Sequence, residues 1–207
     1  MGVEPKPDEH GIVGMARLFP DQDDPQYRLH VALLEAADAG DVQAVDDLLQ
    51  KGAPVRWDTS EGNPLITAAR WHKIDVVTRL LRLDAATFPL FDIEDAVVAA
   101  TDANDVDDST LRLLISRFGP QLSAKARARI LRKAGESMKL DSEFRTAPSG
   151  PAVRFLIDEA KFDVNTPLSD SGDTLLDLAS IGNESHQDHP LIAFVKARGG
   201  RSGLARK

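Results

Sequence analysis

Acid–base catalysis is one chemistry that this sequence could support, because several carboxylates fall in stretches whose apolar residues recur at helical spacing: Glu35, Asp38, Asp102 and Asp177. If some of them faced a common groove, they could act as general acid and general base. Carboxylates on the exposed side of a helix ordinarily serve solubility, however. The sequence also shows no Gly-x-Ser-x-Gly elbow, no phosphate-binding glycine loop and no dinucleotide fingerprint. We therefore lean against an enzyme and expect no catalytic residue.

Metal binding has one candidate segment, which carries two imidazoles and two carboxylates between Glu184 and His189. A zinc site needs three or four such ligands at fixed geometry, supported by hydrogen bonds from neighbouring groups. The same segment also fits an ordinary turn, because Asp188 precedes His189-Pro190 and can cap the following helix. We favour the turn, and we expect neither a metal nor a cofactor.

Two dipeptides, Arg56-Trp57 and Arg70-Trp71, are candidates for contacting another protein. Trp and Arg are strongly enriched among the residues that dominate protein–protein binding energy. The alternative is that each large ring covers the joint between neighbouring structural units.

A secondary basic patch is predicted on one helix in the second half of the chain. Its cations alternate with alanine and aliphatic residues, and at about 3.6 residues per turn four of them share a face: Lys125, Arg129, Arg132 and Lys133. Such a stripe could attract an acidic partner segment, with an affinity that weakens as salt rises. A solvated helix face is the more ordinary interpretation.

The composition is that of a soluble globular protein. The chain has 207 residues, 42% of them hydrophobic and 28% charged, which is enough for one medium-sized core or a row of small modules. Cysteine is absent, which excludes disulfides and Cys-ligated zinc and suits a reducing compartment. The formal net charge of −8 argues against nucleic-acid binding, because phosphate contacts need concentrated Lys and Arg.

Membrane association is not expected either. No stretch approaches the roughly 20 apolar residues of a membrane span. Residues 1–10 lack the basic-then-apolar order of a signal peptide. We expect an intracellular protein, cytoplasmic or nuclear.

A repeat in the apolar pattern positions these candidate residues. The Ala-Ala pair at 36–37 recurs at 68–69, and the Leu-Leu pair at 48–49 recurs at 80–81, so both pairs recur at an offset of 32 residues. A period near this length indicates stacked units, none of which can bury its apolar face alone.

Each unit is predicted to hold two helices. In the first unit, apolar residues at helical spacing run from Leu29 to Ala37 and again from Val42 to Leu49. Gly40 separates the two helices and Gly52 ends the second, since glycine readily adopts the left-handed conformation that closes a helix.

These residues resemble the ankyrin repeat, which consists of a helix, a tight turn, a second helix and a projecting hairpin loop. The run Gly62-Asn63-Pro64-Leu65-Ile66-Thr67-Ala68-Ala69 is similar to the family's opening pattern, with Asn63 in place of Thr and Ile66 in place of His. The run from Gln50 to Val55 is similar to the family's closing pattern. The specific part of the resemblance covers Leu33 to Leu81.

The resemblance is thinner after Leu81, where three further units are counted. The third and fourth are degenerate, and the fourth carries an insertion at 137–149 before its second helix at 151–157. The fifth opens at Gly172 and closes with a helix at 189–198.

The resemblance therefore implies an all-α fold, an α-solenoid of about five ankyrin-like helix-turn-helix repeats with short hairpin loops. We expect the repeat domain over 27–199, preceded by an extension over 1–26 with a short capping helix at 11–19. A flexible basic tail is expected over 200–207.

The function that this resemblance implies is protein–protein interaction through the concave face and hairpin tips, here of units 1 to 3. In the repeat register, the two Arg-Trp dipeptides converge near one groove, and Trp71 takes a position that ankyrin proteins leave exposed on the concave side. The expected protein is a monomer that binds another protein, of a kind that the sequence does not name.

The alternative is a small-molecule-binding protein or an enzyme, for example an isomerase or a cyclase. The degenerate units 3 and 4 could bend the stack and open an apolar pocket between Phe118, Phe144 and Phe155. A third possibility is a regulatory fragment whose acidic surface mimics another ligand, and net charge alone supports it.

Overall fold

The computed structural model describes residues 24–57, 62–84, 86–101, 108–140, 151–180 and 190–203. Every regular element within these ranges is a helix, and they contain no strand. The described part of the fold is therefore all-α, as the sequence predicts.

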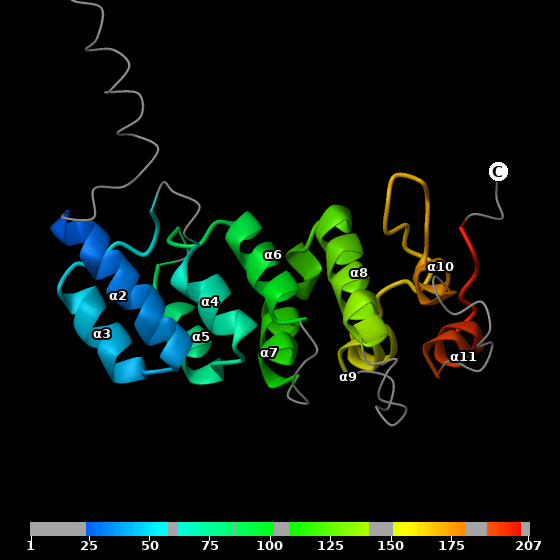
Figure 1. Ribbon diagram of the computed structural model, residues 1–207, viewed down its shortest axis with the longest axis horizontal. Coiled ribbons are helices and arrows are strands. Elements are labelled where there is room, and N and C mark those ends of the chain that lie inside the picture. The colour runs from blue at the N-terminus through cyan, green and yellow to red at the C-terminus, as the bar shows by residue number, and fades with distance from the viewer. Residues whose placement is uncertain are drawn as a thin grey trace, which may run out of the picture.

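The helices form consecutive hairpins (Figure 1). The first consists of α2 (Pro25–Ala39) and α3 (Val42–Gln50), and the second of α4 (Pro64–Arg70) and α5 (Ile74–Leu80). The third consists of α6 (Leu90–Ala99) and α7 (Ser109–Phe118), followed by the short 3-10 helix η1 (Gly119–Gln121). The fourth consists of α8 (Ala124–Leu140) and α9 (Pro151–Arg154), which continues into the π-helical turn η3 (Phe155–Glu159). The last consists of α10 (Leu175–Ser180) and α11 (Pro190–Ala197).

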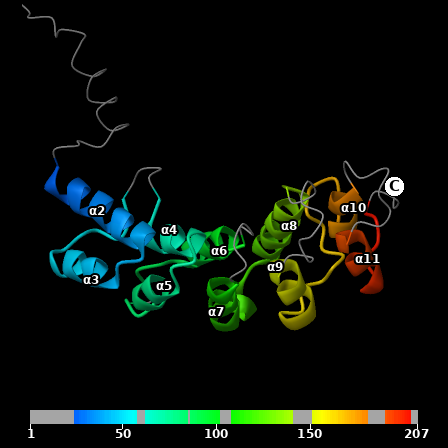
Figure 2. The same ribbon diagram turned by 60° about the horizontal axis from the view of Figure 1, so that its bottom comes forward.

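The hairpins lie side by side in the order of the sequence. α4 packs against α2 and α6, α6 packs against α8, and α8 packs against α10. In the second row, α5 packs against α3 and α7. Figure 2 separates the two rows, with α2, α4, α6, α8 and α10 above and α3, α5, α7 and α9 below. The chain is thus an elongated double row of helices.

Short polar side chains begin the helices of the first two hairpins. Asp24 Oδ1 accepts the backbone N–H of Gln26 at 2.8 Å, and Asp41 caps α3 in the same way. Asn63 Oδ1 accepts the N–H of Ile66 at 2.9 Å, and the following Pro64 occupies the first helical position, where no N–H is needed. The Asn63-Pro64 opening therefore starts α4 at the residue that the sequence predicts.

Glycine closes the two helices of the first hairpin, as predicted. Gly40 has a φ of 82° and donates its N–H to the Ala36 carbonyl, so α2 ends and the chain turns back into α3. Gly52, after α3, has a φ of 80°. Both lie in the left-handed region, which side chains other than glycine rarely adopt.

The repeated apolar residues fill a continuous core between the rows. Both Ala-Ala pairs, at 36–37 and 68–69, are buried, as are Leu65, Leu80 and Leu81. Small alanine side chains let the neighbouring helices α2, α4 and α6 approach closely. The same buried cluster extends as far as α11.

The fourth hairpin differs from the sequence-based expectation. The predicted insertion at 137–149 begins inside a helix, because α8 continues to Leu140. The second helix begins near 151 as expected, but it widens at Phe155, whose carbonyl accepts the N–H of Ala160 at 2.9 Å. This five-residue spacing is the hydrogen-bond pattern of a π-helix.

Part of the expected flexible tail has defined partners. The Arg201 carbonyl accepts a hydrogen bond from Thr174 Oγ1 at 2.7 Å. Ser202 Oγ and the N–H of Gly203 both donate to the Asp177 carboxylate. Residues 201–203 are therefore held against the start of α10, and the expectation of a tail from 200 onward does not fit them.

Other expectations fall partly or wholly outside the described residues. Residues 1–23 of the expected extension over 1–26, with its capping helix at 11–19, lie outside them. The expected boundary at 26–27 is wrong, because α2 already begins at Pro25. The metal-candidate segment at 184–189 also lies outside them. Among the residues that the structure does describe, no helix combines the length and the apolar character needed to cross a membrane.

Candidate binding sites

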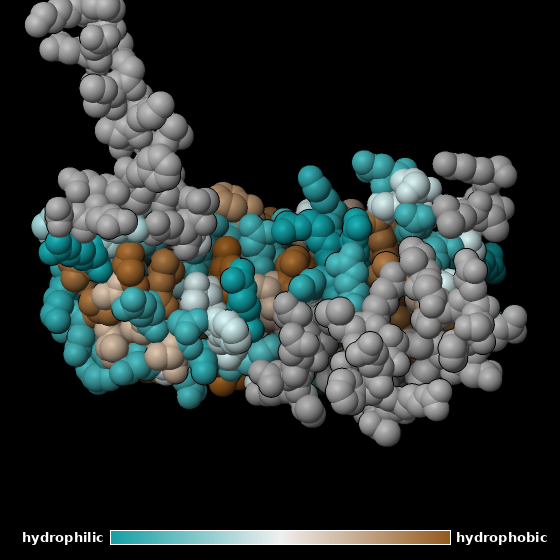
Figure 3. Space-filling view, in the orientation of Figure 1, coloured by the Kyte–Doolittle hydropathy of each residue, from teal (hydrophilic) through white to brown (hydrophobic). Residues whose placement is uncertain are grey.

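The first candidate site is the α4–α6 surface, which we define as Arg56, Arg70, Trp71, Leu90 and Phe91. Trp71 directly follows α4 and is 54% exposed, and Phe91 in the first turn of α6 is 53% exposed. Together with Leu90, they are the large apolar side chains left exposed in the described part of the chain. Figure 3 shows apolar groups over α2, α4 and α6, whereas hydrophilic groups cover α8.

Arg56 lies between an exposed ring and a buried carboxylate. Its guanidinium carbon is 5.0 Å from the centroid of the Phe91 ring, and its Nε is 3.5 Å from Asp92 Oδ2. The Asp92 side chain is only 6% exposed, and Oδ2 accepts no hydrogen bond among the described residues. Burial raises the pKa of the Asp92 carboxyl above its ordinary value, Arg56 opposes that rise and Asp95 adds to it. Arg56 thus provides the counter-charge for Asp92 and also faces Phe91.

Trp57 turns inward and packs on its own chain. Its ring centroid is 5.6 Å from that of Tyr27 and 5.9 Å from that of His30. His30 is fully buried, and its Nδ1 lies 2.8 Å from the Pro54 carbonyl oxygen. These contacts place Trp57 at the joint between α2 and the segment after α3, which is the packing alternative for this residue.

The structure does not bring the four predicted anchors together in one groove. α4 and α6 run side by side in the same direction (Figure 1). Arg56 contacts the first turn of α6, whereas Arg70 and Trp71 lie at the far end of α4. Arg70 is exposed and has no ion-pair partner within the described ranges. The α4–α6 surface therefore has two separate ends, each with an Arg and an exposed ring.

The predicted basic patch of α8 is partly neutralised by carboxylates of the same chain. Arg129 Nη2 is 2.7 Å from Asp95 Oδ1 on α6, and Arg132 Nε is 2.9 Å from Glu136 Oε1 one turn further along α8. The lysines of the patch, Lys125 and Lys133, lie on the same helix. Less of the positive charge of this patch than expected is therefore available to an acidic partner.

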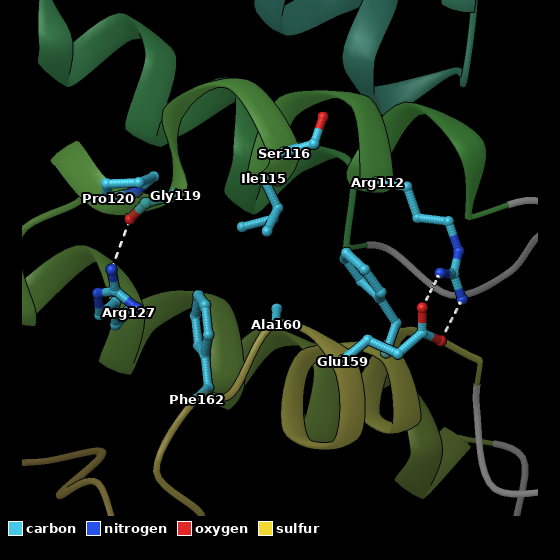
Figure 4. Close-up of a pocket in the computed structure, with 10 residues that line it drawn as sticks. Arg112, Ile115, Ser116, Gly119, Pro120, Arg127, Glu159, Ala160 and Phe162 are labelled. Carbon is cyan, nitrogen blue, oxygen red and sulfur yellow. Dashed lines mark hydrogen bonds and ion pairs between the residues drawn. The ribbon is translucent and has the colours of Figure 1, made fainter.

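The second candidate site is a groove of about 530 Å³ between α7, η1, the beginning of α8 and η3 (Figure 4). Its middle is apolar. Ile115 from α7 faces Ala160 and Phe162, which follow η3, and Phe155 of η3 also lines the groove. We call it the α7–η3 groove.

One end of the α7–η3 groove is closed by a bridge between its two walls. Arg112 on α7 donates to both carboxylate oxygens of Glu159, at 2.5 and 2.9 Å, and its Nε donates to Asp108 at 2.8 Å. Its guanidinium carbon also lies 4.3 Å from the centroid of the Phe155 ring. The bond to Glu159, followed by that to Asp108, raises the pKa of Arg112, and the same bond lowers the pKa of Glu159. The charge of Arg112 is therefore matched within the chain.

The other end of the α7–η3 groove holds a cation, Arg127, whose hydrogen-bond acceptors are neutral. Arg127 Nη2 donates to the Gly119 carbonyl at 2.5 Å, and its Nε donates to the Leu122 carbonyl at 3.4 Å. Its guanidinium carbon is 4.9 Å from the centroid of the Phe162 ring. Across the described residues, no carboxylate pairs with Arg127. The groove is therefore asymmetric, with a neutralised cation at one end and an unneutralised cation at the other.

The α7–η3 groove only partly matches the pocket expected between three phenylalanines. Phe155 lines it, but Phe118 does not, and Phe144 lies outside the described residues. Sequence reasoning missed Arg112 and Glu159, which are 47 residues apart. Arg127 could have been noticed, because it interrupts the basic stripe of α8 and points to another face.

Those carboxylates considered for acid–base chemistry that the structure describes do not form a pair. Glu35 and Asp38 are exposed on α2, and Asp102 lies outside the described residues. Burial alone would raise the pKa of Asp177, but hydrogen bonds from Ser202, Thr174 and Gly203 outweigh burial and lower it. Where side chains are described, no three His, Asp or Glu residues are grouped so that they could hold a metal ion.

Compared with models of known protein families and with curated proteins, the sequence matches none. The resemblance to ankyrin repeats consequently stays a prediction from the residue pattern.

Proposed function

We propose that this protein is an ankyrin-like α-solenoid that binds another protein, without catalysis, through the α4–α6 surface. The stacking of helical hairpins in chain order supports this proposal, as do the Asn63-Pro64 opening and the glycine turn at Gly40. The hairpin tip at 58–61 lies outside the described residues, so the proposal rests on the helices.

The observation that carries the proposal is the exposure of two aromatic rings, Trp71 and Phe91, on neighbouring helices of one row. Comparable side chains in the described core are buried, including Phe88, Leu65 and Leu111. Aromatic side chains supply large apolar areas, and they gain most when a partner removes those areas from water. Exposed aromatic rings beside Arg are typical of interface residues that dominate affinity.

The chemistry of the surface also describes the partner. Trp71 and Phe91 lie at opposite ends of the α4–α6 surface. A partner segment that contacts both rings must be long enough to follow α4 and α6, and it must carry apolar side chains near both of its own ends. Arg70 has no carboxylate within the described ranges, so we expect the partner to carry an acidic residue next to the side chain that meets Trp71. The partner is therefore an extended or helical segment with apolar anchors and acidic neighbours.

The experiment compares four baits in the cell lysate of the native host: the wild-type protein, Trp71→Ala, Phe91→Ala and Lys196→Ala. Lys196 is exposed on α11, at the far end of the rows, so its variant is the matched control. We expect at least one host protein to be retained equally by the wild type and by Lys196→Ala. Each aromatic variant should retain about tenfold less of that protein. Thermal unfolding of all four baits verifies that they are folded. If every protein is retained equally by the four folded baits, the proposal is wrong.

A further inference from the structure

The α7–η3 groove is lined by α7, η1, the beginning of α8 and η3, whereas the α4–α6 surface lies on other elements. Its volume of about 530 Å³ is within the range of roughly 300 to 1,000 Å³ that is typical of small-molecule sites. A compact organic molecule matches its size.

The apolar middle of the groove favours a flat or cyclic ligand body. Phe155 lies on η3 and Phe162 follows η3, and each ring contacts a cation, Arg112 in the first case and Arg127 in the second. Ile115 faces Phe162 from α7 (Figure 4). Because these contacts hold the rings before any ligand arrives, little ordering is required on binding. An aromatic or alicyclic ring would lie against the parts of these side chains that still face the groove.

The charges of the two ends differ, and this difference selects the charge of the ligand. Arg112 already bonds Glu159 and Asp108, so it has little capacity left for an anion. Arg127 bonds only carbonyl oxygens, and its guanidinium stays protonated at all ordinary pH values. A ligand carboxylate at Arg127 would gain a charge-assisted hydrogen bond. Glu159 would repel a second anionic group at the opposite end.

From this arrangement we infer that the α7–η3 groove binds a small organic monoanion, in which an aromatic or alicyclic ring carries one carboxylate, and that the carboxylate contacts Arg127. The site is independent of the proposed protein-binding surface. The far end of the ligand, beside Arg112 and Glu159, is neutral.

The test uses 2-naphthoate as the probe and its uncharged analogue 2-naphthamide as the matched comparison. Both are titrated into isotope-labelled full-length protein, and amide chemical shifts report the location and the Kd. We expect naphthoate to shift amides of α7, η1, the beginning of α8 and η3. We expect naphthamide to bind there about tenfold more weakly, because it lacks the charge that meets Arg127.

Variants identify the residues responsible. Ala160 points into the groove toward Ile115 (Figure 4), so Ala160→Trp fills the groove, and Lys196→Trp, at an exposed position on α11, is its control. We expect the first to abolish naphthoate binding and the second to leave it unchanged. Arg127→Gln is expected to weaken naphthoate about tenfold and naphthamide little, whereas Arg129→Gln, on the same helix but paired with Asp95, changes neither.

Three results would overturn the inference: shifts that map outside the groove, equal affinity for the two probes, or unchanged naphthoate binding in Ala160→Trp. The comparison of the two probes needs only the wild type, so it decides the question even if Arg127→Gln does not fold. Trp71→Ala must bind naphthoate as the wild type does, which separates this site from the α4–α6 surface.

Discussion

Arg112 and Glu159 join two helical hairpins by paired hydrogen bonds of 2.5 and 2.9 Å. The two residues lie 47 positions apart, on α7 and on η3, and both are partly exposed. The bond therefore spans the α7–η3 groove at its rim, where solvent and salt can reach it.

The first prediction concerns this bridge. Glu159→Gln should lower the melting temperature in low salt, and the difference from wild type should shrink toward zero near 1 M salt, because exposed charges are screened there. Because Arg112 lowers the pKa of Glu159, the contribution is present above the ordinary carboxyl pKa and is lost as the pH falls through the lowered value. Melts of wild type and variant across salt and pH measure both effects. Glu136→Gln, which breaks a pair within one helix, is the control.

The second prediction concerns Asp177, which is 7% exposed and anchors residues 202–203. Asp177→Asn keeps the shape but places an NH₂ group against N–H and O–H donors, so it should lower the free energy of unfolding by about 1–3 kcal/mol at pH 7. Urea denaturation measures this loss.

The pH dependence of the same variant has a definite sign. The pKa of Asp177 is lowered in the folded state from its ordinary 3.8, so the stability from its ionised form is present above pH 3.8 and disappears as the pH falls through the lowered value. The gap in free energy of unfolding between wild type and Asp177→Asn should therefore narrow in acid. Asp170→Asn, at an exposed position nearby, should show no such gap at any pH. A gap that is constant with pH would contradict the role of the ionised carboxylate.

The third prediction concerns Asp92, where the sign is opposite. Burial raises its pKa above 3.8, so the folded state holds the proton more tightly than the unfolded state does. The free energy of unfolding of the wild type therefore falls as the pH rises from 3.8 through the raised pKa. Asp92→Asn removes this loss, so the variant should be more stable than wild type at pH 7 and equal to it below about pH 3. Arg56→Gln removes the opposing cation and should destabilise at pH 7 but not in acid. Thermal melts at several pH values decide between these outcomes.

The fourth prediction tests the contact between α8 and α10. A Cβ at Gly135 would lie 2.7 Å from Leu175 Cδ1 and 2.8 Å from Leu178 Cδ2, and Leu175 is fully buried. Gly135→Val should therefore cost about 1–3 kcal/mol in unfolding free energy through overpacking. Arg132→Val places the same residue on the exposed side of α8 and should cost below about 1 kcal/mol. Equal losses in urea denaturation would show that α8 and α10 do not approach closely.

The sequence predicts well those features that a few neighbouring residues determine. Asn63 and Pro64 start α4 because a side-chain cap and a fixed φ act within one turn. Gly40 closes α2 because its left-handed conformation is a local property. Both alanine pairs and the Leu80-Leu81 pair are buried, and Leu48 and Leu49 are partly buried against the same core, because their spacing follows the helical period.

The features that the sequence does not predict depend on contacts between distant residues. Trp57 and Trp71 follow an Arg in the same way, yet Trp57 packs on Tyr27 and His30 while Trp71 stays exposed. The repeat register predicts that Trp71 is exposed, but no local pattern predicts that Trp57 packs inward. The anchoring of residues 201–203 likewise depends on Asp177, which belongs to another helix.

The sequence predicts a pocket that includes Phe155, but it does not predict the walls of the α7–η3 groove, for a geometric reason. The groove exists because the two walls come from separate hairpins and because a π-helical turn, not a regular α-helical end, leads to Phe162. The basic spacing in α8 indicated a solvated stripe, but the cations of this helix lie in different environments. Arg129 meets Asp95 on α6, and Arg127 turns toward Phe162.

The most direct measurement for the central claim is a chemical-shift footprint of the captured partner on isotope-labelled full-length protein. The proposed function predicts that the largest amide shifts fall in α4 and the first turns of α6, around Trp71 and Phe91, and that Trp71→Ala weakens the complex by about tenfold. A footprint confined to α5, α7 and η3, or to α10 and α11, would contradict the claim that this protein binds its partner through the α4–α6 surface.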